Sequence, residues 1–592
     1  MSTRTGFVST VLAGARKFIN RFIIFGHFSP APNVCANAKF GFQRHDQGVT
    51  SLDDRRTLSG KEIRQVLLAG DLDALESLFD QLWYDLPDRF APEIISATSS
   101  LSPHEFDRRP RLLHVTLLAH GQQHFAAGDT ELRKVVHYFG TYGRRFASRL
   151  SAYRDSSDLL SGGTLAVISA RLRGAYDDSE RLGSWVDQQL ALRVGNHMLP
   201  WGSTSTAARP GWLSGQRGIT ATLAGNFDSA VNHFTRAHAE AGLAPTEHYA
   251  GANAVANLAM LAAFQGHLDI ARSWLQTLDE MGDLPDWIEH LTIVGAKIAR
   301  ALIAIEEGDA ERASYHLVTV GPATQAIELW PFAAFAQASH DAYFGDPHQG
   351  LQRLQEARFT HSAHTPTGVG TAAGRLTLLA EAKLLLRAQT GHRILALARE
   401  NPDENPLEVQ VAWVHLLAGH HQEAIRVAAK ALNRACLSGP DTVSVHLVLA
   451  IAHLRENNRD RAAQAFETAV RLQSSPALIG PFLSATSEDL ETLSRLAGVP
   501  NPLRLARISI RPNPPGSGSI VRLTRREQAV LEALDSGRSP QQAASAFGLS
   551  VTTVRSQIRS LYKKLGVSKR AAALARAHEL GLLSESRQPD HR

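Results

Sequence analysis

Hydrophobic residues recur at intervals of three and four along most of the chain, from about residue 57 to about residue 496. This spacing places them on one face of a helix, so it predicts a succession of helices. The alternating pattern that indicates strands is scarce in the same stretch, and alanine, a strong helix former, is abundant. The pattern therefore predicts an all-α fold.

A short motif repeats within this helical stretch: a glycine is followed five residues later by an alanine. Four copies begin at Gly225, Gly266, Gly308 and Gly419, a fifth begins at Asn457, and a degenerate copy begins at Gly345. The five clear copies are 41, 42, 111 and 38 residues apart, so the longest interval has room for further units. Looser copies at 69–73 and 127–131 place the start of the array near residue 57.

Each position of the motif has a structural role. Glycine, or asparagine in its place, permits the left-handed backbone that ends one helix, and the acidic residue that follows favours the start of the next. The alanine lets two helices approach closely. The motif resembles the tetratricopeptide class, although the period is nearer 40 than 34. We therefore interpret residues 57–500 as a tetratricopeptide-like α-solenoid with an extended concave surface; a series of unrelated helical hairpins is the alternative.

The two ends of this array differ from it in composition. Residues 511–519 contain three prolines and two glycines, which resist helix and strand, so residues 501–519 are predicted to be a linker. Nine extended residues span about 30 Å, and we expect the last domain to move relative to the array. Residues 1–56 are predicted to be flexible or poorly structured, because basic residues interrupt their apolar runs and no secretory signal results.

Residues 520–592 predict four helices and the turns between them. Thr524 and Glu527 form a capping box, and the first helix runs to about Asp535. The remaining signals are Ser539 and Gly548 around the second helix, Ser550 and Gly566 around the third (551–565), and Ser568 and Gly581 around the fourth. Two helices joined by a tight glycine turn are typical of a helix-turn-helix.

Charge separates this C-terminal region from the rest. The chain holds 62 basic and 57 acidic residues, for a net charge of +5. Residues 522–592 contain 13 basic and 6 acidic residues, a net +7, whereas the preceding 521 residues carry a net −2. The excess positive charge would attract a polyanion such as nucleic acid; a solvated basic tail is the alternative.

About 60 residues of this region resemble the four-helix LuxR-type DNA-binding domain. The residues that carry the resemblance are Leu523-Thr-Arg-Arg-Glu527, Gly537, Ala544, Leu549-Ser550, Thr553-Val554-Arg555, Lys564-Leu565, Val567 and Arg570. The resemblance implies that the third helix enters the major groove of double-stranded DNA. It implies base reading by Arg555, Ser556 and Arg559, and phosphate contacts by Ser550, Thr552, Thr553, Gln557 and Lys564.

Three further expectations follow from the resemblance. Arg555 stands where lysine is usual and Gln557 where histidine is common, so the favoured DNA sequence would differ. Val554, Ile558 and Leu561 are expected to pack in the core. The fourth helix pairs two domains in this family, which implies a homodimer on an inverted DNA repeat; a monomeric domain that uses these residues as core is the alternative.

A helical array joined to such a domain is similar to the large bacterial regulators related to the maltose activator, which carry an ATP-binding module. Here the Gly60-Lys61 pair has Arg55 where a phosphate loop requires glycine, and no serine or threonine follows. No cofactor is therefore expected. His120 and His124 lie one helical turn apart, but no third ligand for a metal is evident, and no arrangement of residues indicates an enzyme.

The sequence thus predicts a cytoplasmic transcription regulator, since two cysteines indicate a reducing compartment and no apolar run is long enough to cross a membrane. In this interpretation the array senses an unknown protein or small-molecule effector, and the C-terminal domain binds DNA. Two alternatives stay open: an interaction scaffold with a vestigial DNA-binding domain, and a degenerate ATPase of the same regulator class. The sequence specifies neither the DNA target, nor the effector, nor the direction of regulation.

Overall fold

The computed structural model contains only helices, turns and loops among the residues it describes, with no strand, so the all-α prediction is confirmed. The described residues are 59–125, 142–196, 209–243, 247–284, 288, 292–322, 328–362, 365–401, 406–433, 437–473, 478–505, 523–579 and 582–583. The predicted N-terminal segment 1–56, the loose repeat copy at 127–131 and residues 506–519 of the predicted linker lie outside these ranges.

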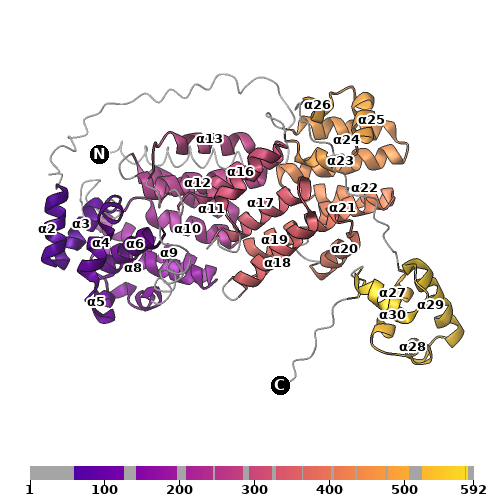
Figure 1. Ribbon diagram of the computed structural model, residues 1–592, viewed down its shortest axis with the longest axis horizontal. Helices are drawn as coiled ribbons and strands as arrows, with labels where there is room; N and C mark the ends of the chain where they lie inside the picture. The colour runs from indigo at the N-terminus through magenta and orange to yellow at the C-terminus, as the bar shows by residue number, and fades with distance from the viewer. Residues whose placement is uncertain are drawn as a thin grey trace. The chain divides into compact units, whose positions relative to one another are not determined.

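Helices α2 to α26 form the part of the chain that we call the array (Figure 1). The first of them are α2 (Gly60–Ala69), α3 (Leu72–Leu82), α4 (Leu86–Thr98), α5 (Pro103–Arg108), α6 (Pro110–Phe125) and the 3₁₀ helix η2 (Leu150–Ala152). The last are the 3₁₀ helix η4 (Gly480–Ser484), α25 (Ser487–Ala497) and α26 (Pro502–Leu505). Helix α26 lies inside the segment 501–519 that was predicted to be a linker.

Between these ends, the described residues form eight helical hairpins that follow one another. The first helices of the hairpins are α8 (Ser156–Leu172), α10 (Trp212–Leu223), α12 (Glu247–Gln265), α15 (Val294–Glu306), α17 (Trp330–Tyr343), α19 (Ala372–Arg387), α21 (Glu408–Leu417) and α23 (Gly439–Arg455). The second helices are α9 (Tyr176–Asn196), α11 (Phe227–Ala241), α13 (Leu268–Asp279), α16 (Ala310–Val320), α18 (Pro347–His361), α20 (Gly391–Glu400), α22 (His421–Leu432) and α24 (Arg459–Arg471). The hairpins built on α17 and α19 fill the longest interval between motif copies, as the spacing predicts.

The repeated motif has the backbone conformation that its residues predict. Gly225, Gly266, Gly308, Gly419 and Asn457 all have a left-handed φ, between 59° and 82°. The alanine five residues after each of them is completely buried against the neighbouring helix. The motif therefore marks the tight turn inside a hairpin.

Two further hairpins have the same turn with different residues. Gly174 has φ 73° and the residue five positions later is the buried Ser179. Gln389 has φ 60° and is followed by the buried Ile394. The sequence does not show these copies as repeats, because another residue replaces the alanine in the first copy and both the glycine and the alanine in the second.

The first helices of the hairpins form an inner layer. Each of them contacts the first helix of the next hairpin, from α8 through to α23. Along α8, α10, α12, α15, α17, α19 and α21, no described side chain is exposed. The second helices bury only one stripe, as α11 does through Phe227, Ala230, Phe234 and Ala237.

The inner layer is buried because hairpins distant in the sequence close over it. The Arg171 guanidinium at the end of α8 pairs with Glu328, which precedes α17, at 2.6 Å. The backbone of Gly225 lies against that of Gly370, before α19, and the Ile479 amide donates to the Glu306 carbonyl at 2.6 Å. These contacts cover the inner helices at the places where they occur.

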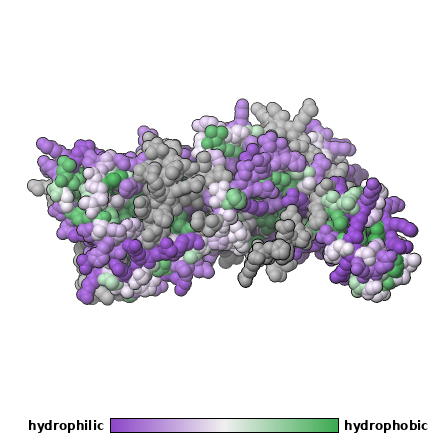
Figure 2. Space-filling view, turned by 60° about the horizontal axis from the view of Figure 1, so that its bottom comes forward, coloured by the Kyte–Doolittle hydropathy of each residue, from purple (hydrophilic) through white to green (hydrophobic). Residues whose placement is uncertain are grey.

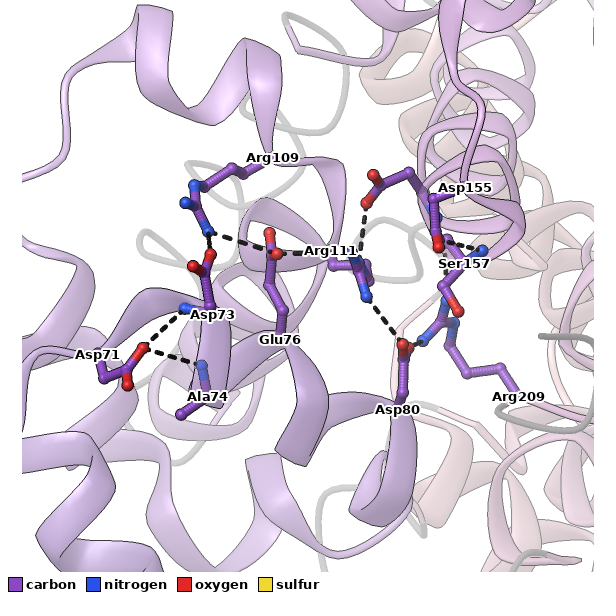
Figure 3. Close-up of polar contacts among 11 residues, drawn as sticks. Asp71, Asp73, Ala74, Glu76, Asp80, Arg109, Arg111, Asp155, Ser157 and Arg209 are labelled. Atoms are coloured by element: carbon purple, nitrogen blue, oxygen red, sulfur yellow. Dashed lines mark hydrogen bonds and ion pairs between the residues drawn. The ribbon is translucent and has the colours of Figure 1, made fainter.

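A network of partly buried ion pairs joins the first helices of the array (Figure 3). The Arg209 side chain, which is completely buried, pairs with Asp80 of α3 at 2.7 Å. Arg111 of α6 bridges Asp80 at 3.0 Å and Asp158 of α8 at 2.8 Å. Because an unpaired charge in such a position is strongly destabilising, this network fixes how α3, α6 and α8 pack together.

Helices α27 (Arg525–Asp535), α28 (Pro540–Phe547), α29 (Val551–Leu565) and α30 (Arg570–Glu579) have a hydrophobic core of their own. We call them the C-terminal helices. Their core includes Val530, Leu531 and Leu534 from α27, each at most 2% exposed, as the sequence predicts. Hydrophilic residues predominate on the described surface in the view of Figure 2. Among the residues that the structure describes, no helix combines the length and the hydrophobicity needed to span a bilayer.

Candidate nucleic-acid interface

The C-terminal helices have the caps and turns of a helix-turn-helix. Thr524 and Glu527 form the predicted capping box, and Ser539 forms a second one with Gln542 at the start of α28. Gly548 ends α28 in the left-handed conformation, with φ 63°, and Ser550 caps α29 by accepting a hydrogen bond from the Thr553 amide. Only one residue, Leu549, separates the two caps, so α28 and α29 are held in a tight turn.

Helix α29 has a buried face and an exposed face. Val554 and Leu561 are completely buried, and Ile558 packs against the same core, as expected. The opposite face carries Thr552, Arg555, Ser556, Arg559 and Lys563, all of them exposed. Thr552, Arg555, Arg559 and Lys563 are three or four positions apart in turn and Ser556 lies beside Arg555, so their side chains follow one side of the helix.

The exposed face holds three cations that no described carboxylate pairs with: Arg555, Arg559 and Lys563. The sequence predicted DNA contacts for the two arginines but not for Lys563. The signal was available, because Lys563 is four residues beyond Arg559 and eight beyond Arg555. A row of unpaired cations on one helical face is an electrostatic site for a polyanion.

Hydroxyl groups cluster at the N-terminus of α29. The Ser550 Oγ atom lies 2.7 Å from the Thr552 Oγ1 atom and 2.7 Å from the Thr553 Oγ1 atom. It also accepts from the Thr553 amide at 3.1 Å. Three of the residues predicted to contact phosphate are thus together, at a helix end whose amide dipoles favour an anion.

The predicted phosphate-binding residue Lys564 has a protein partner. Its Nζ atom lies 2.6 Å from a carboxylate oxygen of Glu527, a residue of α27 that is 5% exposed. The same carboxylate accepts hydrogen bonds from the Ser560 hydroxyl at 2.7 Å and from the Thr524 amide at 2.7 Å. Burial raises the pKa of Glu527, but these bonds outweigh it and lower the pKa to about 2. Glu527 therefore joins the start of α27 to the C-terminal half of α29.

Gln557 is the other predicted phosphate-binding residue on this side of α29. It is partly buried, and its Oε1 atom is buried without a hydrogen-bond partner among the described residues. Gln557 thus lies at the edge of the exposed face rather than in its centre.

Helix α30 packs one side against the core of the C-terminal helices and exposes small residues on the other. It begins at Arg570, two residues after the predicted cap Ser568, and Arg570 donates to the Leu534 carbonyl of α27 at 2.5 Å. Ala573 and Ala577 are completely buried. The outward side chains include Ala571, Ala572 and Ala575, which form a small exposed apolar surface. The predicted end of the helix at Gly581 lies outside the described residues.

Comparison with known proteins identifies a family for the C-terminal segment. Residues 521–577 match the family model described as bacterial regulatory proteins, luxR family. The match covers the capping box, the helix-turn-helix and most of α30, and it supports a role in transcription regulation through DNA binding. No solved structure matches the chain.

Proposed function

We propose that this chain, whose C-terminal segment belongs to the luxR family of bacterial regulatory proteins, reads a specific DNA sequence with α29. The observation that carries the proposal is the exposed face of that helix. Arg555, Ser556 and Arg559 lie on it side by side, on a rigid helix that Val554 and Leu561 anchor in the core. An α-helix fits the major groove of B-form DNA, and arginine is the commonest reader of guanine there.

Base reading falls to the N-terminal half of α29. Arg555 and Arg559 can each present two N–H groups to the O6 and N7 atoms of a guanine, and Ser556 lies between them. The arginines have no described acidic partner that would compete with the DNA. This part of the face therefore determines the sequence preference.

Phosphate contacts surround the base-reading residues. Ser550, Thr552 and Thr553 present hydroxyls at the start of α29, and Gln557, Lys563 and Lys564 follow the helix toward its end. Contacts of this kind position the protein on DNA without reading the sequence. Lys563 is the strongest electrostatic contributor in this proposal, because the Glu527 carboxylate already neutralises Lys564.

The remaining parts of the proposal concern assembly and sensing. The exposed alanines of α30 form a small surface on which a second copy of the domain can pack, so that two copies of α29 read an inverted repeat. The array, which makes up most of the chain, would sense a protein partner or a small-molecule effector and control binding.

The test is a titration of the full-length protein with DNA. Arg555→Ala and Arg559→Ala should each weaken binding to the preferred sequence by about 1–3 kcal/mol and relax the preference at one base pair. The control is Arg538→Ala, which removes an exposed arginine between α27 and α28. Unchanged affinity and unchanged preference in both α29 variants would contradict the assignment.

A further inference from the structure

Inside the array, five structural elements meet around a cavity of about 50 Å³. It is lined by the end of α17, by α19 and α21, by the start of α23 and by η4. A volume of this size holds roughly four water molecules, so an occupant has about four to six non-hydrogen atoms. The lining elements come from four successive hairpins and from η4, so an occupant would contact several of them at once.

Two basic side chains line the cavity. Lys383 and Arg387 lie four residues apart on α19, hence on the same face of that helix. The Lys383 Nζ atom is 4.9 Å from the ring centre of Phe335, and the Arg387 guanidinium carbon is 5.1 Å from the ring centre of Tyr343. No carboxylate of a described residue lies within ion-pair distance of Lys383. Burial lowers the pKa of Lys383, but Tyr343, Glu306 and Asp441 raise it above the ordinary value.

Two serine hydroxyls in the lining are set to act as donors. The Trp413 indole N–H donates to Ser444 Oγ at 2.7 Å, and the Arg387 guanidinium donates to Ser484 Oγ at 3.1 Å. Each hydroxyl oxygen therefore accepts a bond from the protein, and its own hydrogen is left to donate. Together with the two cations, these hydroxyls make the cavity a site for an anion.

The lining also contains acceptors. Gln410 of α21 is 4% exposed, and its Oε1 atom has no hydrogen-bond partner among the described residues. Asp441, at the start of α23, adds a carboxylate to the same cavity. A buried amide oxygen without a hydrogen-bond partner destabilises the folded protein, and a ligand that donates to it would remove that cost.

We propose that this cavity binds a small carboxylate that carries a hydrogen-bond donor on the adjacent carbon, that is, an α-hydroxy or α-amino acid. The carboxylate lies between Lys383 and Arg387 and accepts from the serine hydroxyls. The hydroxyl or ammonium group donates to Gln410 and Asp441. The inference rests on the proposed sensing role of the array, for which it supplies the site and the class of effector.

The experiment is a calorimetric titration of the full-length protein, without DNA, with four probes: L-lactate, L-alanine, propionate and lactamide. Lactate or alanine should bind, and which of the two binds more tightly identifies the donor as hydroxyl or ammonium. Propionate, which lacks the donor, should bind more weakly, and lactamide, which lacks the charge, should not bind. Failure of both acids to bind, or equal binding of lactamide, would overturn the proposal.

Matched variants assign the binding to this cavity. Lys383→Met keeps an unbranched side chain but removes the ammonium group, and it should weaken binding by about tenfold or more, because a charge-assisted hydrogen bond is lost. Gln410→Leu should reduce the advantage of lactate or alanine over propionate. Arg399→Met, on the exposed face of α20, should bind as the unaltered protein does. Equal affinity of the Lys383→Met and Arg399→Met proteins would exclude the site.

The DNA titration separates this proposal from the proposed function. If the acid binds and leaves DNA affinity unchanged, the ligand site stands and the sensing role fails. If the acid does not bind while α29 still reads DNA, the ligand site fails and the DNA-reading function stands.

Discussion

Glycine has two functions at positions 225 and 266. Both residues adopt the left-handed conformation, and both lie against backbone or ring atoms of a distant hairpin. A Cβ atom added to Gly266 would lie 2.2 Å from Pro440 Cδ, whereas one added to Gly419 would have no atom within 4 Å. At position 419 the glycine of the motif is needed only for the turn. At position 266 it is needed for the turn and also for the close contact with a distant hairpin.

Substitution of Gly419 and Gly266 separates the cost of the left-handed backbone from the cost of the close contact. Gly419→Ala should lower the free energy of unfolding by about 1–2 kcal/mol, the cost of a left-handed alanine. Gly266→Ala should cost about 1–3 kcal/mol more, because the Pro440 ring must also move. Gly419→Asn should be better tolerated than Gly419→Ala, since Asn457 occupies the equivalent position. Urea denaturation measures all three, and equal losses for the two alanine variants would refute close packing at Gly266.

The sequence predicts local features of individual residues well. The capping residues of α27 and α29, the left-handed turns and the buried side of α29 all depend on residues within about five positions of one another. The pairing of Lys564 with Glu527 could not be predicted in this way, because 37 positions separate the two residues. Nor could the contact between Gly225 and Gly370, which depends on how several hairpins stack.

At the scale of elements, α29 is fixed by α27 through one carboxylate. Glu527 accepts from Thr524 on its own helix and from Ser560 and Lys564 on α29. The capping box, which the sequence alone shows only as the start of a helix, therefore also joins α27 to α29. Lys563 and Lys564 are neighbours with different surroundings, since the first is exposed without a described acidic partner and the second is paired.

The two lysines should respond differently to substitution. Lys564→Ala should destabilise the C-terminal helices by about 1–3 kcal/mol, because Glu527 loses a charged partner, and hydrogen exchange in α27 and α29 should accelerate. Lys563→Ala should leave exchange unchanged, weaken DNA binding and reduce its salt dependence by about one counterion. Exchange that accelerates in the Lys563 variant and not in the Lys564 variant would contradict this division.

At the scale of the whole molecule, the array buries polar groups as well as hydrophobic ones. Glu306, at the end of the inner helix α15, is 6% exposed, and its Oε2 atom has no partner among the described residues. Burial raises its pKa to about 7. Between about pH 4.5 and pH 7, the Glu306 carboxyl group is mostly protonated in the folded protein and mostly charged in the unfolded protein. The free energy of unfolding therefore decreases as the pH rises through this range.

This linkage can be measured by removing the group. Glu306→Gln should be as stable as the unaltered protein near pH 4.5 and more stable by about 2–3 kcal/mol above pH 7, where only the unaltered protein must bury or neutralise a charge. The control is Glu311→Gln, at an exposed position on α16. Other groups also make stability depend on pH, among them the buried His114, whose pKa is lowered by burial. Because their contributions are the same in both variants, the comparison removes them. A difference that does not depend on pH would contradict the assignment.

The most direct test of the central claim, that α29 reads DNA, is selection of duplexes from a random-sequence library by the full-length protein. We predict that successive rounds at low salt enrich an inverted repeat with guanine in each half-site, and that the Arg555→Ala and Arg559→Ala proteins lose that preference. Retention of no duplex, or of all duplexes equally, would contradict the account.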